Sequence, residues 1–260
     1  MLAGFFHTLE VRLLATSNSL LIIGLPRSLS THIYQVCRRV LKKELRHPTS
    51  TGGAATSGEI LNYVPDWFGS KRLGETRMEF YPDFERILNE HAEGYVVKDV
   101  TQWAMVTRYL AENPGTYKLL RLHRNLADIV CRMWALQWMH PLWAVPEYAT
   151  LVTDKTYRLG GALAHEGLRM LVASLVHIQE TYLFPSSAEP VAYGRLVAGN
   201  GHLRDALRAL GYSPGPVRYC DAPFRSIAKK KLAIRHTPFW HKVDQMVREA
   251  QNGRRAAGVR

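Results

Sequence analysis

The residues from Gly24 to Thr31, Gly-Leu-Pro-Arg-Ser-Leu-Ser-Thr, bring one cation and several hydroxyl groups together directly after a short apolar run. A strand that turns into a helix here would direct backbone N–H groups and the positive end of the helix dipole to one point. Arg27 adds a planar cation that can bind two oxygens of one phosphate. The segment therefore predicts an anion site, although an ordinary strand, turn and N-capped helix would show the same residues.

Other common sites are not indicated by the sequence. The Walker pattern ending in Gly-Lys-Ser/Thr is absent, which argues against ATP or GTP hydrolysis, and no Gly-x-Ser-x-Gly motif marks a hydrolase. No His-x-x-x-His or Cys-x-x-Cys pair is present. The three cysteines, Cys37, Cys131 and Cys220, are too widely spaced for a disulfide framework or a four-ligand zinc site. We therefore expect no metal and a reducing compartment.

The elements that must position the anion site follow from the pattern of apolar residues. Three short apolar segments, at 20–23, 94–97 and 117–122, have the composition of buried parallel strands. Each precedes a polar stretch and then a helical pattern. Helices are expected over 31–45, about 103–110, 127–139, 157–182 and 203–210. Alternating strands and helices predict an α/β fold with a central parallel sheet, and ligands of such sheets bind beyond the carboxyl ends of the strands.

The composition is that of a globular chain, with 260 residues, 47% of them hydrophobic and 22% charged. We expect one domain spanning residues 1–260, with an N-terminal extension at 1–18 and a disordered tail at 252–260. The net charge of +12 favours anionic partners, from nucleic acid to phosphorylated small molecules. No run approaches the roughly 18 apolar residues of a membrane-spanning helix, so we expect no membrane partner.

Three segments resemble the signatures of the sulfotransferases. Residues 24–31 resemble the 5′-phosphosulfate loop of that family, which usually reads Pro-Arg/Lys-Ser-Gly-Ser/Thr-Thr after the first strand. Residues 122–130 resemble the second signature, a strand ending in Arg-Asn/Asp-Pro-x-Asp before a helix. Residues 190–196 are a weaker match to a Tyr-Glu-Asp-Leu stretch. The matches occur in the family's order and together cover Leu20 to Tyr212.

The resemblance implies a three-layer, P-loop-like fold with a central parallel sheet flanked by helices. It also implies 3′-phosphoadenosine 5′-phosphosulfate as donor and adenosine 3′,5′-bisphosphate as product, with no metal. The sulfuryl group would pass to a hydroxyl or amine of a small metabolite or carbohydrate. We expect a soluble, cytoplasmic enzyme of bacterial type.

The same resemblance implies roles for individual residues. Arg27 would hold the 5′-phosphate and neutralise the leaving group, and Arg124 would bind the 3′-phosphate. Arg132 stands where the family has a serine for the 3′-phosphate. The rest of the donor loop would be formed by Pro26, Ser28, Leu29, Ser30 and Thr31. Leu29 replaces the family's loop glycine, so the turn must either avoid a positive φ or bear strain.

The acceptor base is indicated less directly. The family's histidine after the second strand is missing, because the matching stretch is Lys98-Asp99-Val100. Glu59 occupies a place comparable to that of a glutamate in carbohydrate-type members. It would accept the acceptor's proton, or it is an ordinary residue at a helix start. Lys98 would stabilise the transferring oxygens, or it forms an ion pair with Asp99 or Glu59.

Trp134 and Trp138, four residues apart, are predicted to share one helix face, either as core or as the wall of an acceptor pocket. Three other functions remain compatible with the sequence besides sulfuryl transfer. One is an inactive sulfotransferase-like module that only binds nucleotides. The second is a basic nucleic-acid-binding protein. The third is a kinase-like phosphotransferase, which would need magnesium and prefer ATP.

Overall fold

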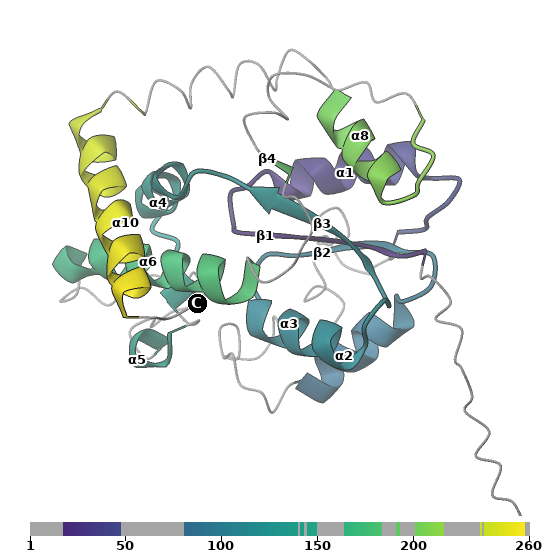
Figure 1. Ribbon diagram of the computed structural model, residues 1–260, viewed down its shortest axis with the longest axis horizontal. Coiled ribbons are helices and arrows are strands. Elements are labelled where there is room, and N and C mark those ends of the chain that lie inside the picture. Colours follow the sequence, from purple (N-terminus) through teal and green to yellow (C-terminus); the bar gives the residue numbers. More distant parts are fainter. Residues whose placement is uncertain are drawn as a thin grey trace, which may run out of the picture.

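The structure is a computed structural model, which describes residues 18–47, 81–139, 141–142, 145–149, 164–183, 191–192, 201–215, 235 and 237–257. Figure 1 shows its elements in chain order. They are β1 (Leu20–Gly24), α1 (Ser30–Val40), α2 (Tyr81–Glu90), β2 (Val96–Asp99), α3 (Trp103–Glu112), β3 (Lys118–His123), α4 (Leu126–Ala135), α5 (Pro146–Ala149), α6 (Ala164–Ile178), the π-helical turn η5 (Gln179–Leu183), β4 (Val191–Ala192), α8 (Gly201–Ala209) and α10 (Pro238–Ala256).

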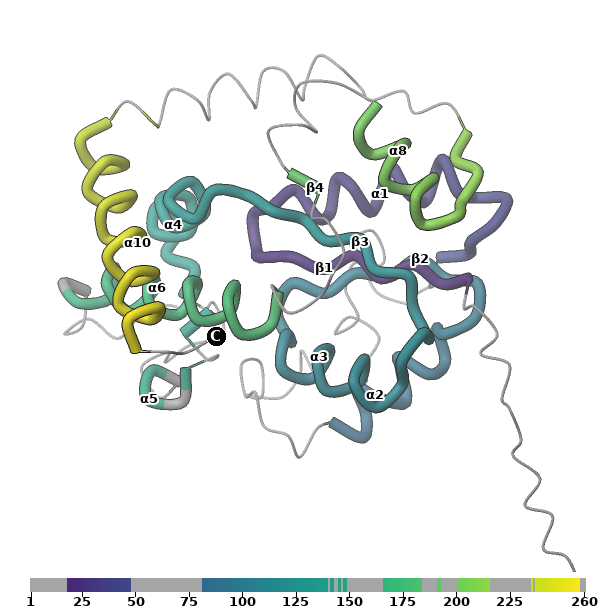
Figure 2. Tube along the Cα trace, in the orientation of Figure 1, coloured from purple at the N-terminus to yellow at the C-terminus, as the bar shows by residue number. Residues whose placement is uncertain are grey.

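The strands form one sheet in the order β2-β1-β3-β4, and every neighbouring pair is parallel. The predicted α/β fold with a parallel sheet is therefore confirmed. Leu20 and Ile22 of β1 pack with α1 and α8 on one face of the sheet. Leu21 and Ile23, whose side chains point the other way, pack with α2 and α3. The same arrangement of helices about the strands can be followed in Figure 2.

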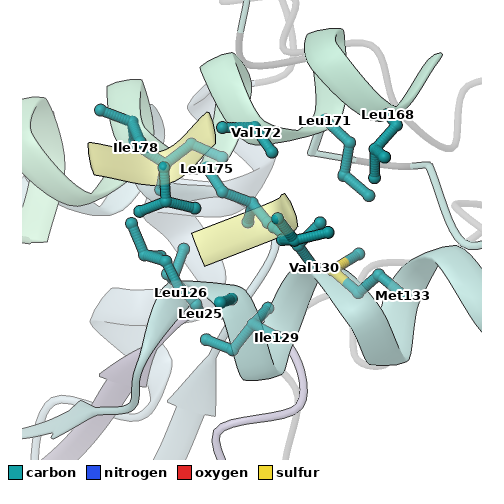
Figure 3. Packing of buried hydrophobic residues seen from close by; sticks show 14 of the residues in the cluster. Leu25, Leu126, Ile129, Val130, Met133, Leu168, Leu171, Val172, Leu175 and Ile178 are labelled. Carbon is teal, nitrogen blue, oxygen red and sulfur yellow. The ribbon is translucent and has the colours of Figure 1, made fainter. Parts of the chain in front are cut away.

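A third apolar cluster lies beyond the carboxyl ends of the strands, where α4, α6 and α10 pack together. Leu25, directly after β1, and Leu126, at the start of α4, both belong to it. Figure 3 shows Leu25 beside the α4 and α6 side chains of this cluster. The residues that follow β1 and β3 are thus anchored in one core, which fixes the two loops next to each other.

Several element boundaries differ from the predicted ones. The first helix ends at Val40 instead of residue 45. The chain leaves the helix because Arg46 forms backbone hydrogen bonds beside β2. The Arg46 N–H donates to Gly94 O at 2.6 Å, and the Arg46 carbonyl accepts from Val96 N–H at 2.9 Å. Lys98 and Asp99, expected in a turn, are the last residues of β2.

The end of the chain also differs from the prediction. Helix α10 continues to Ala256, past residue 252, where we expected the disordered tail to begin. Arg254 explains the added order, because its Nε lies 2.8 Å from Glu180 Oε2 and ties the last turn of α10 to η5. Most of the predicted N-terminal extension, residues 1–17, lies outside the described residues.

Candidate anion-binding site

The loop between β1 and α1 contains two residues other than glycine with left-handed backbone conformations. Arg27 has φ 63° and Leu29 has φ 72°. Such conformations cost on the order of 1–3 kcal/mol each and persist where the surrounding structure imposes them. Of the two outcomes expected at Leu29, the structure therefore shows the strained one.

Gly24 allows this loop to approach the next strand closely. A Cβ at this position would lie 3.0 Å from Ser28 Oγ and 3.1 Å from Leu122 Cβ, both closer than side chains normally pack. Gly24 O also accepts a hydrogen bond from the Trp103 indole N–H at 3.0 Å. The loop is thus held between β3 and the start of α3.

The start of α1 is not capped by a side chain, and its first turn contains no acidic residue. The side-chain cap of an ordinary N-capped helix is therefore not found among the described residues. The positive helix end remains available to an external anion. Ser28 lies inside the loop with 1% exposure, and its Oγ has no hydrogen-bond partner in the described part of the chain. A buried hydroxyl normally finds a partner, so Ser28 is a candidate donor to a ligand at this helix end.

Pro26 and Ser30, predicted to belong to the loop, are buried within it, whereas Thr31 is exposed on the first turn of α1. The predicted loop residues from 26 to 31 thus surround the start of α1, some buried beneath it and some exposed to solvent.

Arg27 is half-buried, and its guanidinium lies over the Trp138 ring, with Cζ 3.8 Å from the ring centroid. Burial, and after it the positive charge of Arg132, lower the pKa of the Arg27 side chain. The charge of the exposed Arg132 thus acts on Arg27, and neighbouring cations favour the binding of an anion. Trp138 holds the Arg27 side chain by a cation–π contact.

This role of Trp138 differs from the prediction that Trp134 and Trp138 share a helix face. Helix α4 ends at Ala135, and Gln137 has φ 54°, which turns the chain so that Trp138 N–H bonds Met133 O at 2.9 Å. Trp134 packs against the apolar cluster, whereas Trp138 is 40% exposed beside Arg27. The sequence pattern could not distinguish the roles of Trp134 and Trp138, because both fit one uninterrupted helix.

Arg124 lies directly against the loop. Its Nη1 donates to the Arg27 carbonyl at 2.6 Å, and its side chain is almost completely buried. Its Nε lies 3.8 Å from Asp128 Oδ2 on the next turn. The resemblance placed Arg124 on a phosphate, and the structure places its guanidinium on the loop backbone. Arg27 and Arg124 are thus brought together, with Arg132 as the exposed cation of α4.

Asp128 connects this region to the C-terminal part of the chain. Its carboxylate accepts two hydrogen bonds from Arg235, at 3.1 and 2.7 Å, and one from Trp240 Nε1 at 2.9 Å. Asn125 caps α4 by accepting from Asp128 N–H at 3.2 Å. The second signature therefore has an evident structural purpose here, which sequence reasoning missed because Arg235 and Trp240 lie more than a hundred residues away.

Lys98 and Asp99, at the predicted site of proton and sulfuryl transfer, lie on opposite faces of the sheet. Lys98 and Asp99 are successive residues of β2, so their side chains point to opposite faces. Lys98 is buried in register with Ile22, on the face covered by α1. Asp99 accepts from the N–H groups of Thr101 at 3.2 Å and Gln102 at 2.9 Å, which orders the start of α3. An ion pair between Lys98 and Asp99 is therefore not formed. Glu59 lies outside the described residues.

A cavity of about 610 Å³ opens on the Asp99 side of the sheet, between α3 and η5. Asp99, Ile23 and Arg121 stand side by side in the strand register and line it. Most of its other lining is apolar, and it includes Trp103, Val106, Leu110 and Leu119. Burial lowers the pKa of Arg121, which is 8% exposed. Arg121 could have been identified from the sequence, because it is the one charged residue in the apolar run 119–122.

The described residues contain no group of three or more histidine, cysteine, aspartate or glutamate side chains that could hold a metal ion. Burial raises the pKa of the Cys37 thiol to about 12 and of the Cys131 thiol to about 11, so neither is poised as a nucleophile. In the part of the chain that the structure covers, no helix has both the length and the apolar surface to cross a bilayer. Comparisons with protein-family models, curated proteins and solved structures find no match.

Proposed function

We propose that the protein binds 3′-phosphoadenosine 5′-phosphosulfate at the β1–α1 loop and transfers its sulfuryl group to a hydroxyl or amine of a small acceptor. The observation that carries this proposal is the uncapped start of α1, with the buried Ser28 hydroxyl inside the loop and Arg27 beside it. This combination supplies backbone, hydroxyl and guanidinium donors to one anion.

The donor would occupy the loop with its 5′-phosphosulfate on Arg27, Ser28 and the first turn of α1. We assign its 3′-phosphate to Arg132, because that cation is exposed and close enough to shift the pKa of Arg27. Arg124 acts as a positioning residue that holds the Arg27 carbonyl. A bisphosphate can bridge Arg27 and Arg132, and this would offset the repulsion between them.

In the transfer, the acceptor oxygen or nitrogen attacks sulfur as the bond between sulfur and the bridging phosphate oxygen breaks. The acceptor's proton passes to a base, for which Glu59 is the proposal from the sequence, and the electron pair stays on the departing phosphate. Arg27 stabilises that negative charge. Lys98, which the sequence suggested for the sulfuryl oxygens, lies on the α1 face of the sheet, opposite the acceptor cavity, so we give it no role in the transfer. Alignment and charge stabilisation supply most of the catalysis in such group transfers.

The acceptor would lie in the cavity that begins at Ile23, the residue before Gly24. Its mostly apolar walls favour an acceptor with an apolar body. Arg121 and Asp99 supply the polar groups that would orient it.

Calorimetry with adenosine 3′,5′-bisphosphate and with adenosine 5′-phosphate tests the donor assignment. We expect the 3′-phosphate to strengthen binding, and Arg132→Ala to remove most of that gain while leaving binding of the monophosphate unchanged. Arg27→Ala should weaken binding of both nucleotides by about ten-fold, the loss expected for a charged hydrogen bond. Arg204→Ala, an exposed arginine on α8, is the matched control. Equal affinity of the wild type for the two nucleotides would remove the donor assignment.

A nucleotide-binding module without chemistry is the second candidate. It is favoured by the strained Leu29 and by the buried Val100 at the position where the resemblance leads us to expect a histidine. Both candidates bind adenosine 3′,5′-bisphosphate, but only the enzyme forms a sulfated product from the donor. Mass spectrometry on a panel of apolar alcohols, phenols and amines separates them, with Glu59→Gln expected to retain nucleotide binding and lose turnover.

A further inference from the structure

A second basic site lies at the opposite end of α1 from the loop. Here the last turns of the helix, the turn that follows and the start of β2 form a groove of about 710 Å³. Four cations line it, Arg38, Arg39, Lys42 and Arg46, together with His47 and Tyr95. No aspartate or glutamate belongs to the lining that the structure describes.

The arginines of this groove are held by groups that carry no negative charge. Arg38 Nη2 donates to His47 Nε2 at 2.6 Å, and Arg39 Nε donates to the Gln35 carbonyl at 3.2 Å. Arg46 Nη2 donates to the Glu93 carbonyl at 3.0 Å, and its guanidinium lies over the Tyr95 ring, 4.4 Å from the centroid. These partners fix the side chains without cancelling their charge.

Several arginines elsewhere in the described chain instead pair with carboxylates. These pairs are Arg86–Glu90, Arg108–Glu112, Arg235–Asp128, Arg248–Asp244 and Arg254–Glu180. Even the acidic residue nearest in sequence to the groove, Glu44, directs its Oε1 to Ser213 N–H at 3.0 Å. Within the residues that the structure describes, the groove therefore carries an uncompensated positive charge on preorganised side chains.

The helix dipole accounts for only part of this arrangement. Arg38 and Arg39 lie in the last turn of α1, where a cation stabilises the carbonyl end of a helix. Lys42 and Arg46 lie beyond the helix, and Arg46 is positioned by its pairing with Tyr95. The helix dipole therefore does not explain why Lys42 and Arg46 also line the groove.

We infer that this groove binds a small polyanion that carries at least two phosphate or sulfate groups. Arg38 and Arg39 are the neighbouring cations of the last turn of α1, and Lys42 follows two residues after its end, so these cations face neighbouring anionic groups of one ligand and not widely spaced ones. Guanidinium groups fixed in place bind such oxygens with two parallel hydrogen bonds. The inference does not depend on the proposed function, because none of the groove residues belongs to the β1–α1 loop.

Titration calorimetry with inorganic tripolyphosphate at low ionic strength tests the groove. We expect binding in the wild type and in Arg27→Ala, the background that weakens the loop site. The double variant Arg39→Ala/Lys42→Ala should bind about ten-fold more weakly in either background, from two exposed charge contacts. Lys43→Ala removes an equally exposed charge from the next position, outside the groove, and should bind like its parent. Equal losses in the double variant and in Lys43→Ala would overturn the site.

A series of oligothymidylates of increasing length separates a small ligand from a nucleic acid. Affinity should stop rising once the strand offers two or three phosphates, because the groove is short. A continued rise with length, together with a steep loss in salt, would show an extended nucleic-acid surface and contradict the inference. Failure of tripolyphosphate to bind at all would do the same.

Discussion

Leu29 has the most unfavourable residue type for its conformation in the loop. A leucine at φ 72° pays a steric cost of roughly 1–2 kcal/mol that glycine does not pay. Its side chain recovers part of this cost, because it is partly buried against the cluster that includes Leu20 and Ile33. Packing of the Leu29 side chain thus stabilises the loop conformation. A glycine would adopt the same conformation without strain but without this packing.

This balance predicts an unusual order of stability for two variants. Leu29→Ala should lose the packing and keep the strain, whereas Leu29→Gly should lose the packing and release the strain. We expect Leu29→Gly to be the more stable of the two by about 1 kcal/mol, the reverse of the usual order. Urea unfolding monitored by tryptophan fluorescence gives both values. If Leu29→Ala were the more stable variant, Leu29 would not be left-handed in solution.

At the scale of elements, Asp128 decides how α4 and α10 meet. The carboxylate is buried and receives Arg235 and Trp240 from the C-terminal part of the chain, while Arg124 stands beside it and holds the loop. One side chain therefore connects the packing of two helices to the backbone of the anion site.

Loss of this carboxylate should cost much more than loss of its exposed partner. Asp128→Ala leaves the buried Arg124 without its nearby charge, and we expect a decrease in the free energy of unfolding of roughly 3 kcal/mol. Arg235, 39% exposed, should cost about 1 kcal/mol or less on replacement by alanine. Chemical denaturation measures both. Equal losses would mean that Arg124 does not depend on Asp128.

The elements could be predicted from the sequence wherever local patterns decide them. The strands at 20–23 and 117–122 and their parallel pairing follow from apolar runs that alternate with helices. The end of α1 and the turn before Trp138 depend on contacts with distant residues, such as the pairing of Arg46 with Gly94 and Val96. The predicted loop residues do lie together. The contacts of Arg46 with the Glu93 carbonyl and the Tyr95 ring could not be predicted, because these groups lie more than forty residues away in the sequence.

For the whole molecule, partly buried histidines should set how stability depends on pH. Burial lowers the pKa of His32, His123 and His177 below the ordinary value of 6.5, with nearby Arg39 and Arg254 adding to the effect at the first and the last. The unfolded chain then binds protons more readily than the folded one. Stability should be full above about pH 6.5 and be lost as the pH falls through the lower folded values.

The melting temperature, followed from about pH 8 to about pH 5, should therefore decrease on the acid side. The triple variant His32→Gln/His123→Gln/His177→Gln should show a flatter profile over the same range, whatever its absolute stability. A slope unchanged in the triple variant would assign the acid sensitivity to carboxylates instead.

The link from Asp128 to Arg235 spans 107 residues of sequence. During synthesis, the β1–α1 loop and its supporting Arg124 leave the ribosome long before Arg235 and Trp240 have been made. A nascent chain should therefore carry an incompletely braced loop for much of its translation, and the ability to hold an anion there should mature only after α10 has docked.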